Sequence, residues 1–190
     1  ILDDPRLFEW NIFHQPANLK KMCFDIDGVL CDDPTPEQND DGAKYKQFLM
    51  NSLPKIIPSG CIGNIVSARL EKYRSETELW MRKNGVKYEN LILLNATAEE
   101  RRNKNQHATF KAEYYKKSNA ILFVESEERQ AIEINNLTGK PVFCTENNKF
   151  YSGDKKYSIK FESKSKIRGF FRRSGILRNI YSHLNGRGKR

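Results

Sequence analysis

The sequence predicts an α/β fold, a Rossmann-like three-layer sandwich around a mainly parallel five-stranded sheet. Short and continuously apolar segments alternate with segments of helical composition, which is typical of parallel strands covered by helices on both faces. Polar residues follow several of the apolar segments, at the strand ends where such sheets bind ligands. A chain of 190 residues is long enough for one substantial core, which we expect over residues 20–145.

Five apolar segments supply the predicted strands. They are rich in Ile, Val, Leu, Phe and Cys, and each is too short for a helix of ordinary length. Because a helical segment lies between each strand and the next, the strands are expected to run parallel. The predicted strands cover residues 20–26, 62–66, 91–94, 120–124 and 141–144.

Helical segments fill the intervals between these strands. Pro54 closes the first of them. Ser75 and Glu78 have the spacing of a capping box that starts the second, and Gly85 is placed to end it. Gly139 ends the last helix in the same way. The predicted helices cover residues 42–53, 75–85, 97–118 and 131–137.

The two ends of the chain differ from the predicted core. Residues 1–19 contain aromatic residues and prolines without periodicity, so we expect a lead-in or linker segment. Residues 146–190 begin with a predicted hairpin around residues 152–154 and continue from residue 164 as a basic amphipathic helix. The chain opens on Ile1, from which we expect a portion of a longer polypeptide.

The formal charge of +9 is concentrated at the C-terminal end. Residues 154–190 carry 12 Lys and Arg against two acidic residues, whereas the remainder is close to neutral. This distribution argues against a nucleic-acid-binding face on the core. For residues 164–190 a solvated or core-covering tail is the leading interpretation, and contact with a membrane surface or with nucleic acid is the alternative.

Cysteine usage and hydropathy indicate an intracellular protein. No C-x-x-C pair occurs, so buried free thiols are expected rather than disulfides or a zinc site. No apolar run approaches the ~20 residues that span a bilayer, and the first residues lack the pattern of a secretory signal peptide. We therefore expect a cytoplasmic location.

The segment of residues 20–33 holds the strongest functional signal. Its apolar strand delivers Asp25 and Asp27, and Gly28 turns the chain directly afterwards. Two carboxylates at the end of a strand can hold a divalent cation and a phosphate. A calcium-binding loop is excluded, because its glycine stands at the sixth position and Gly28 would be at the fourth.

Polar residues also follow two other predicted strands. Ser67 and Arg69 come after the second strand, and Glu125 follows the fourth. Because the carboxyl ends of parallel strands meet at one edge of a sheet, these side chains are expected to converge with Asp25 and Asp27. Phosphoryl transfer through a carboxylate needs a nucleophile, a proton donor and acceptor, a divalent cation and groups that hold the phosphoryl oxygens. The converging set can supply these parts.

At these residues the sequence closely resembles the haloacid dehalogenase superfamily of aspartate-nucleophile phosphatases. Its first motif, D-x-D-G-[TV]-[LV] after an apolar strand, stands at residues 24–30 as Phe-Asp-Ile-Asp-Gly-Val-Leu. The second is matched by the strand that ends at Ser67, the third by Lys111 before the fourth strand, and the fourth by Glu125. The resemblance covers roughly residues 20–145, with the motifs in the right order, and the first motif is the most specific.

The resemblance implies a role for each matched residue. Asp25 would be phosphorylated, and Asp27 would act as general acid and base. Mg²⁺ would be bound by Asp25, the Asp27 carbonyl and Glu125, with a further acidic ligand behind Glu125. The expected metal ligands are Asp25, Asp27, Glu125 and Glu128. The expected phosphate-binding or substrate-binding residues are Ser67, Lys111, Arg69 and Gly28.

The sequence departs from many superfamily members in its fourth motif, which has glutamates in place of aspartates. Glu127 and Glu128 are both candidates for the acid behind Glu125. Too few positions separate Asp25 from Ser67 for a large cap domain, so a small or absent cap is expected, as in members that act on larger substrates. Residues 8–14 resemble the linker that follows a phosphoribosyltransferase domain in some fused members, which implies a fused or partner domain of that kind.

The expected function is a magnesium-dependent phosphatase that acts on a phosphorylated small molecule or nucleotide through an aspartyl-phosphate on Asp25. One alternative is a catalytically weak phosphate-binding or interaction module with the same fold, tethered by the basic tail. Another is a nucleotidase or polynucleotide phosphatase. The substrate itself cannot be derived from the sequence, since no cap domain supplies specificity residues.

Overall fold

The computed structural model describes residues 14–97, 99–100 and 106–152. The chain divides into two compact units, Ile1–Gly153 and Asp154–Arg190, and the described residues belong to the first. The predicted basic helix from residue 164 and most of the predicted lead-in segment therefore lie outside the described residues.

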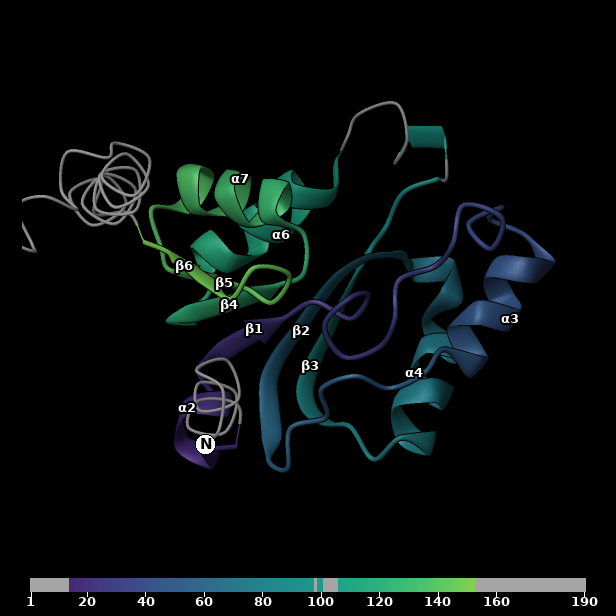
Figure 1. Cartoon of the computed structure of the whole chain (residues 1–190), viewed down its shortest axis with the longest axis horizontal. Helices are drawn as coiled ribbons and strands as arrows, with labels where there is room; N and C mark the ends of the chain where they lie inside the picture. Colours follow the sequence, from purple (N-terminus) through teal and green to yellow (C-terminus); the bar gives the residue numbers. More distant parts are fainter. Residues whose placement is uncertain (1–13, 98, 101–105, 153–190) are drawn as a thin grey trace, which may run out of the picture. The chain divides into compact units, whose positions relative to one another are not determined.

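The described unit is built on a six-stranded sheet with the strand order β3-β2-β1-β4-β5-β6 (Figure 1). The first five strands in this order are parallel, and β6 is antiparallel to β5. The α/β class and the five predicted parallel strands are confirmed. The strands are β1 Met22–Phe24, β2 Cys61–Leu70, β3 Lys87–Leu94, β4 Leu122–Glu125, β5 Val142–Cys144 and β6 Lys149–Tyr151.

The sixth strand corrects the predicted five-stranded sheet. A turn at residues 145–148 lets β6 pair with β5 and become an edge of the main sheet, whereas the hairpin predicted around residues 152–154 lies almost entirely outside the described residues. Asn148 adopts a positive φ of 54°, which asparagine tolerates better than most residues and which allows the tight reversal. Phe150 then lies against Phe143, with 5.4 Å between ring centroids. The sheet thus extends beyond the expected end of the core at residue 145.

Helices cover both faces of the sheet. Helices α6 and α7 pack against each other on one face, whereas α3 and α4 lie together on the opposite side (Figure 1). The helices are α2 Pro16–Leu19, α3 Ala43–Asn51, the 3₁₀-helix η1 Glu71–Tyr73, α4 Arg74–Lys83, α6 Gln106–Lys117 and α7 Glu128–Thr138. This arrangement is the three-layer sandwich that the alternation of strands and helices predicts.

The central strands are apolar on both faces, because each face is covered. Cys23 on β1 and Phe123 on β4 join the core beneath α6 and α7. Their neighbours Phe24 and Val124 point the other way and join the core that contains Trp80 of α4. This period-two alternation explains the continuous apolar runs in the sequence.

The cysteines are free, as predicted. Three of them are buried, and the fourth is half-buried. Burial raises the pKa of the Cys23 thiol to about 12, although a hydrogen bond with Ser118 and the charge of Lys140 act in the opposite direction. The four residues are Cys23, Cys31, Cys61 and Cys144.

The predicted capping box at the start of α4 is wrong. The helix begins at Arg74, directly after η1, and Ser75 lies inside it. Arg74 forms ion pairs with Glu71 at 2.5 Å and with Glu78 at 3.2 Å, so the glutamate of the expected box has another partner. The helix ends as predicted, at Gly85 with a φ of +70°.

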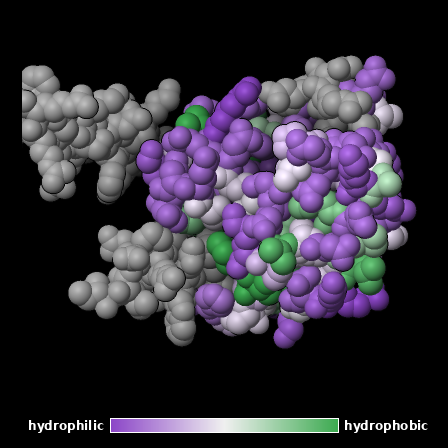
Figure 2. Space-filling model, turned by 45° about the vertical axis from the view of Figure 1, so that its right-hand side comes forward, coloured by the Kyte–Doolittle hydropathy of each residue, from purple (hydrophilic) through white to green (hydrophobic). Residues whose placement is uncertain are grey.

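The surface view shows a largely hydrophilic face with smaller hydrophobic areas between the polar residues (Figure 2). The large apolar side chains that are exposed come from several segments of the unit, two of them from α7. They are Leu53, Leu79, Ile121, Ile132, Leu137 and Phe150. In the described part of the chain no helix has the length and apolar character required to cross a bilayer.

We expect Trp80→Ala to lower the free energy of unfolding by about 3–5 kcal/mol. The Trp80 side chain is fully buried, and its Nε1–H donates a hydrogen bond to the Ser52 carbonyl at 2.8 Å. Leu79→Ala on the same helix is the matched control, since Leu79 is exposed and its loss should cost less than about 1 kcal/mol. Urea denaturation of both variants measures the difference. Equal costs would contradict the packing described for α4.

Candidate functional site

A tight loop follows β1 and presents the two aspartates. The Ile26 carbonyl accepts hydrogen bonds from the backbone N–H groups of residues 29–31, which closes the turn. Gly28 has a φ of +71°, and a Cβ at this position would lie 2.3 Å from Ser126 Oγ. Only glycine allows this close approach of the loop to the end of β4. The sequence signal Asp-x-Asp-Gly therefore has a clear structural cause.

The ends of β1, β2 and β4 open into one pocket of about 660 Å³. The pocket lies at the carboxyl ends of the parallel strands, beside the point where the strand order reverses. The chain runs outward from β1 to β3 and then crosses back to β4 on the other side of β1. Seven of the eight predicted site residues line the pocket. They are Asp25, Asp27, Gly28, Ser67, Arg69, Lys111 and Glu125.

Lys111 on α6 connects the carboxylates of two strands. Its Nζ donates hydrogen bonds to Asp25 Oδ2 and, at 2.7 Å, to Glu125 Oε2. A third bond reaches Gln130 Oε1 at 3.0 Å. Burial lowers the pKa of the ammonium, but the Asp25 and Glu125 carboxylates outweigh this effect and hold it above its usual range. Lys111 therefore stays charged between the two acids.

Asp25 and Glu125 are both buried at their strand ends. Asp25 Oδ1 accepts a hydrogen bond from the Ile26 backbone N–H at 2.7 Å. Glu125 Oε1 accepts from the backbone N–H groups of Ser126 at 2.9 Å and Glu127 at 3.2 Å. Burial raises the pKa of Glu125 to about 7, although the charge of Lys111 acts in the opposite direction. Each carboxylate oxygen thus has a defined partner.

Asp27, which is partly exposed, forms an ion pair with the buried Arg69 from the end of β2. Arg69 Nη2 lies 2.6 Å from Asp27 Oδ1, and Nε lies 3.2 Å from both carboxylate oxygens. The guanidinium also contacts Thr77 Oγ1 at 3.4 Å and Cys31 Sγ at 3.3 Å. Although burial lowers the pKa of Arg69, the Asp27 carboxylate outweighs this and keeps it above the ordinary value. Arg69 therefore fixes the orientation of Asp27 within the pocket.

Ser67 lies where β2 becomes irregular. The pairing with β3 shifts register between Ser67 and Leu70, which turns the end of the strand toward the pocket. The Ser67 hydroxyl oxygen accepts a hydrogen bond from the Arg69 backbone N–H at 3.4 Å. This buried hydroxyl thus faces the same space as Asp25.

Glu128 is the one predicted site residue that the structure does not bring to the others. Its carboxylate accepts a hydrogen bond from the Tyr151 hydroxyl at 2.6 Å and lies 3.3 Å from Lys149 Nζ. Both partners belong to β6, which was not predicted as part of the sheet. Glu128 as a metal ligand stays a prediction.

The pocket also contains residues that the sequence did not single out. Ser126 donates a hydrogen bond from Oγ to the Asp27 carbonyl at 3.1 Å and so ties the β1 loop to β4. Burial raises the pKa of Asp33, as does the nearby Asp27 carboxylate, and Lys55 opposes this. The signal for Asp33 was its place at the end of the segment of residues 20–33, directly after the first motif. The additional lining residues include Asp33, Lys55, Ser126, Glu127, Gln130 and Glu146.

The donor set of this pocket suits a hard divalent cation. Mg²⁺ is commonly held by one or two carboxylates together with water and substrate oxygens. Asp25, Glu125 and the Asp27 carbonyl offer such oxygens, and the carboxylates of Asp25, Asp27 and Glu125 pair with the two cations Arg69 and Lys111. Among residues 14–97, 99–100 and 106–152 no group of three or more His, Cys, Asp and Glu side chains is arranged around a common metal position. A site here would therefore combine two carboxylates with a backbone carbonyl.

Comparisons with known proteins give no further identification. No family model matches the chain, and no curated protein or solved structure matches it either. The interpretation of the site depends on its own geometry and chemistry.

We expect Lys111→Met to lower the free energy of unfolding by about 3–5 kcal/mol, because Asp25 and Glu125 would remain buried with like charges and no counterion. Lys116→Met, at an exposed position on the same helix, is the control and should cost less than about 0.5 kcal/mol. Adding Glu125→Gln to Lys111→Met removes one of the unpaired charges. That double variant should recover at least about 1 kcal/mol relative to Lys111→Met.

Chemical denaturation in a chelator-containing buffer measures all three free energies. The bridging role of Lys111 is contradicted if Lys111→Met unfolds like the control, or if the second substitution only adds to the loss.

Proposed function

We propose that this chain is a magnesium-dependent phosphatase that works through an aspartyl-phosphate on Asp25. The observation that carries the proposal is the buried carboxylate of Asp25, held by the Ile26 N–H and by Lys111 in a pocket shared with Asp27, Ser67 and Glu125. The mostly parallel sheet and the chain order of the motifs support it further, since both agree with the haloacid dehalogenase superfamily that the sequence resembles.

Asp25, Glu125 and the Asp27 carbonyl are the atoms that would hold Mg²⁺. When bound, the ion neutralises charge on the oxygens of the phosphoryl group. Lys111 balances the two acidic ligands beforehand, because their mutual repulsion would otherwise disfavour the empty site.

In the first step a carboxylate oxygen of Asp25 forms a bond to phosphorus while the bond from phosphorus to the ester oxygen breaks. Asp27, which must first take up a proton from solvent and loosen its ion pair with Arg69, gives that proton to the departing oxygen, which leaves as an alcohol. In the second step Asp27 takes a proton from a water molecule, whose oxygen attacks the same phosphorus. The bond to Asp25 breaks, inorganic phosphate is released, and both aspartates return to their starting forms.

The remaining pocket residues hold these groups in place. Ser67 Oγ and Lys111 Nζ are donors for phosphoryl oxygens, and both are rigid because they are buried. Arg69 touches Asp27 through three of its N–H···O contacts, so it keeps the proton-transferring carboxylate pointed into the pocket. In this arrangement Arg69 acts as a positioning residue for Asp27.

We expect Asp25→Asn to reduce hydrolysis of a generic aryl phosphate by about a thousandfold or more, since the amide cannot act as the nucleophile. Asp32→Asn makes the same charge change at an exposed position outside the pocket and should retain the activity. Chelation should abolish hydrolysis by the unmodified chain, and added Mg²⁺ should restore it. The assay is steady-state release of the aryl alcohol. Full activity of Asp25→Asn would rule out the mechanism.

For Arg69→Lys we expect kcat to fall about 10- to 100-fold with little change in KM, because lysine keeps the charge but not the fork that orients Asp27. Steady-state kinetics on the aryl phosphate separate the two parameters. A large rise in KM with an unchanged kcat would instead support direct contact between Arg69 and the substrate, which the sequence led us to expect.

A further inference from the structure

We propose that this site takes phosphate esters that carry a single phosphate and an alcohol part without negative charge, and that it favours a cationic alcohol part. The proposal names the substrate class for the phosphatase function above and rests on it. It excludes nucleoside polyphosphates and polynucleotides as substrates.

Two of the three Lys and Arg side chains that line the pocket already pair with its own carboxylates. Arg69 is bound to Asp27, and Lys111 is bound to Asp25 and Glu125. The third cation is Lys55, an exposed side chain that shares the pocket lining with the exposed carboxylates of Asp33, Glu127 and Glu146. Recognition of additional phosphates requires Lys and Arg side chains available for them. Within the described lining, Lys55 is the one Lys or Arg outside these ion pairs, and the three exposed carboxylates outnumber it.

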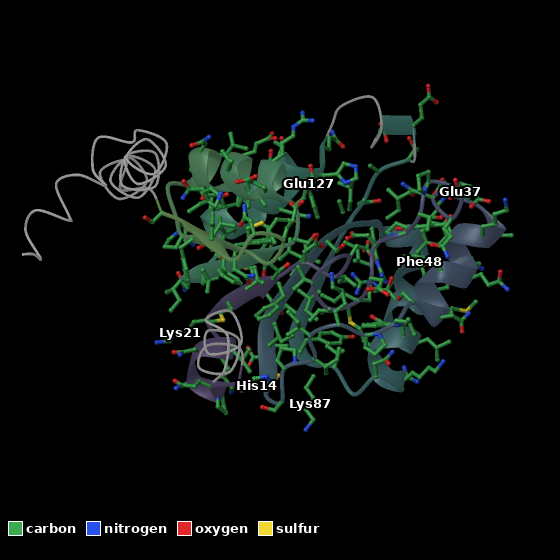
Figure 3. All side chains as sticks on the ribbon, viewed as in Figure 1. His14, Lys21, Glu37, Phe48, Lys87 and Glu127 are labelled. Carbon is green, nitrogen blue, oxygen red and sulfur yellow. The ribbon has the colours of Figure 1, made fainter. Side chains whose placement is uncertain are left out.

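Acidic side chains surround the space beside the buried acids. Glu127 lies at the start of α7 (Figure 3), and Glu146 lies in the turn between β5 and β6. Both are exposed and line the pocket. Glu127 Oε2 accepts a hydrogen bond from Gln130 at 2.5 Å, and Glu146 Oε2 accepts one from the Glu128 backbone N–H at 3.0 Å. These donors are neutral, so they leave both negative charges uncompensated.

The pocket is large enough to hold more than a phosphate. Its volume of about 660 Å³ is typical of sites that enclose whole small molecules. A second cavity of about 240 Å³ adjoins it between α6 and α7, and His107, Glu127 and Gln130 line both. Glu133 adds another carboxylate to the second cavity, opposed there by Arg129. An alcohol part extending in this direction meets acidic side chains again.

The expected size of the effect follows from Coulomb's law. A charge on the alcohol part within several ångströms of two carboxylates, in a partly solvated cleft, changes the affinity by about fivefold. Repulsion of an anionic alcohol part and attraction of a cationic one therefore differ by about tenfold or more in affinity. The difference should shrink as salt screens the exposed glutamates.

The test measures binding rather than turnover. Isothermal titration calorimetry of full-length Asp25→Asn with Mg²⁺ compares three esters of similar size: phosphoethanolamine, glycerol 2-phosphate and 3-phosphoglycerate. Phosphoethanolamine should bind about tenfold or more tightly than 3-phosphoglycerate, with glycerol 2-phosphate in between, and about 0.5 M salt should reduce the ratio. Thymidine 3′-monophosphate should bind more tightly than thymidine 3′,5′-bisphosphate.

Neutralising the rim should remove this preference. Adding Glu127→Gln and Glu146→Gln to the Asp25→Asn chain should lower the ratio of affinities for phosphoethanolamine and 3-phosphoglycerate to about twofold or less. Adding Glu89→Gln and Glu113→Gln instead makes the same charge change outside the pocket and should leave the ratio as it was.

Equal or tighter binding of the anionic esters overturns the proposal, as does a preference that persists without the two rim glutamates. If the expected order of affinities is found but the unmodified chain hydrolyses none of the esters, the phosphatase function alone is overturned. If none of the esters binds, both proposals fail.

Discussion

The ammonium of Lys111 between Asp25 and Glu125 is the interaction on which the rest of the structure depends. It joins α6 to the end of the next strand, β4, and to the end of β1, where Asp25 lies 86 residues away in the sequence. A buried carboxylate without a counterion is costly, and two of them side by side are more so. The helix that covers the sheet must therefore be seated correctly before the acidic strand ends are stable. Stability of the sandwich and geometry of the pocket depend on the same three side chains.

Much of the fold could be predicted because its signals are local. Buried parallel strands give continuous apolar runs, and Gly85 and Gly139 end their helices in the left-handed conformation that few other residues adopt. The start of α4 was missed because Arg74 pairs with Glu71 and Glu78, and these contacts compete with the expected cap. β6 was missed as a strand of the main sheet because its pairing depends on β5 and on the ring contact between Phe143 and Phe150. Such tertiary contacts leave no periodic pattern in the sequence.

The site residues also divide into those that could be placed from the sequence and those that could not. Residues fixed by a strand end, such as Asp25 and Glu125, could be placed from the sequence, because the edge of a parallel sheet gathers them. The order of acids after β4 could not be assigned, since the start of α7 sends Glu127 toward the pocket and Glu128 toward Tyr151. Arg69 was expected at the substrate, and its contact with Asp27 appears only when β2 and the β1 loop are side by side. Sequence gives the strand from which a side chain comes, whereas its partner follows from packing.

The contact between Gly28 and Ser126 has a thermodynamic consequence for ligand binding. With no room for even one methyl group between them, the β1 loop has a single position relative to β4, and the bond from Ser126 to the Asp27 carbonyl maintains it. The loss of conformational entropy needed to bring the two strand ends together therefore occurs during folding. A ligand that enters the pocket meets oxygens that are already held in position, so little of its binding free energy is consumed in ordering the protein. This glycine thus contributes to affinity although it has no side chain with which to touch a ligand.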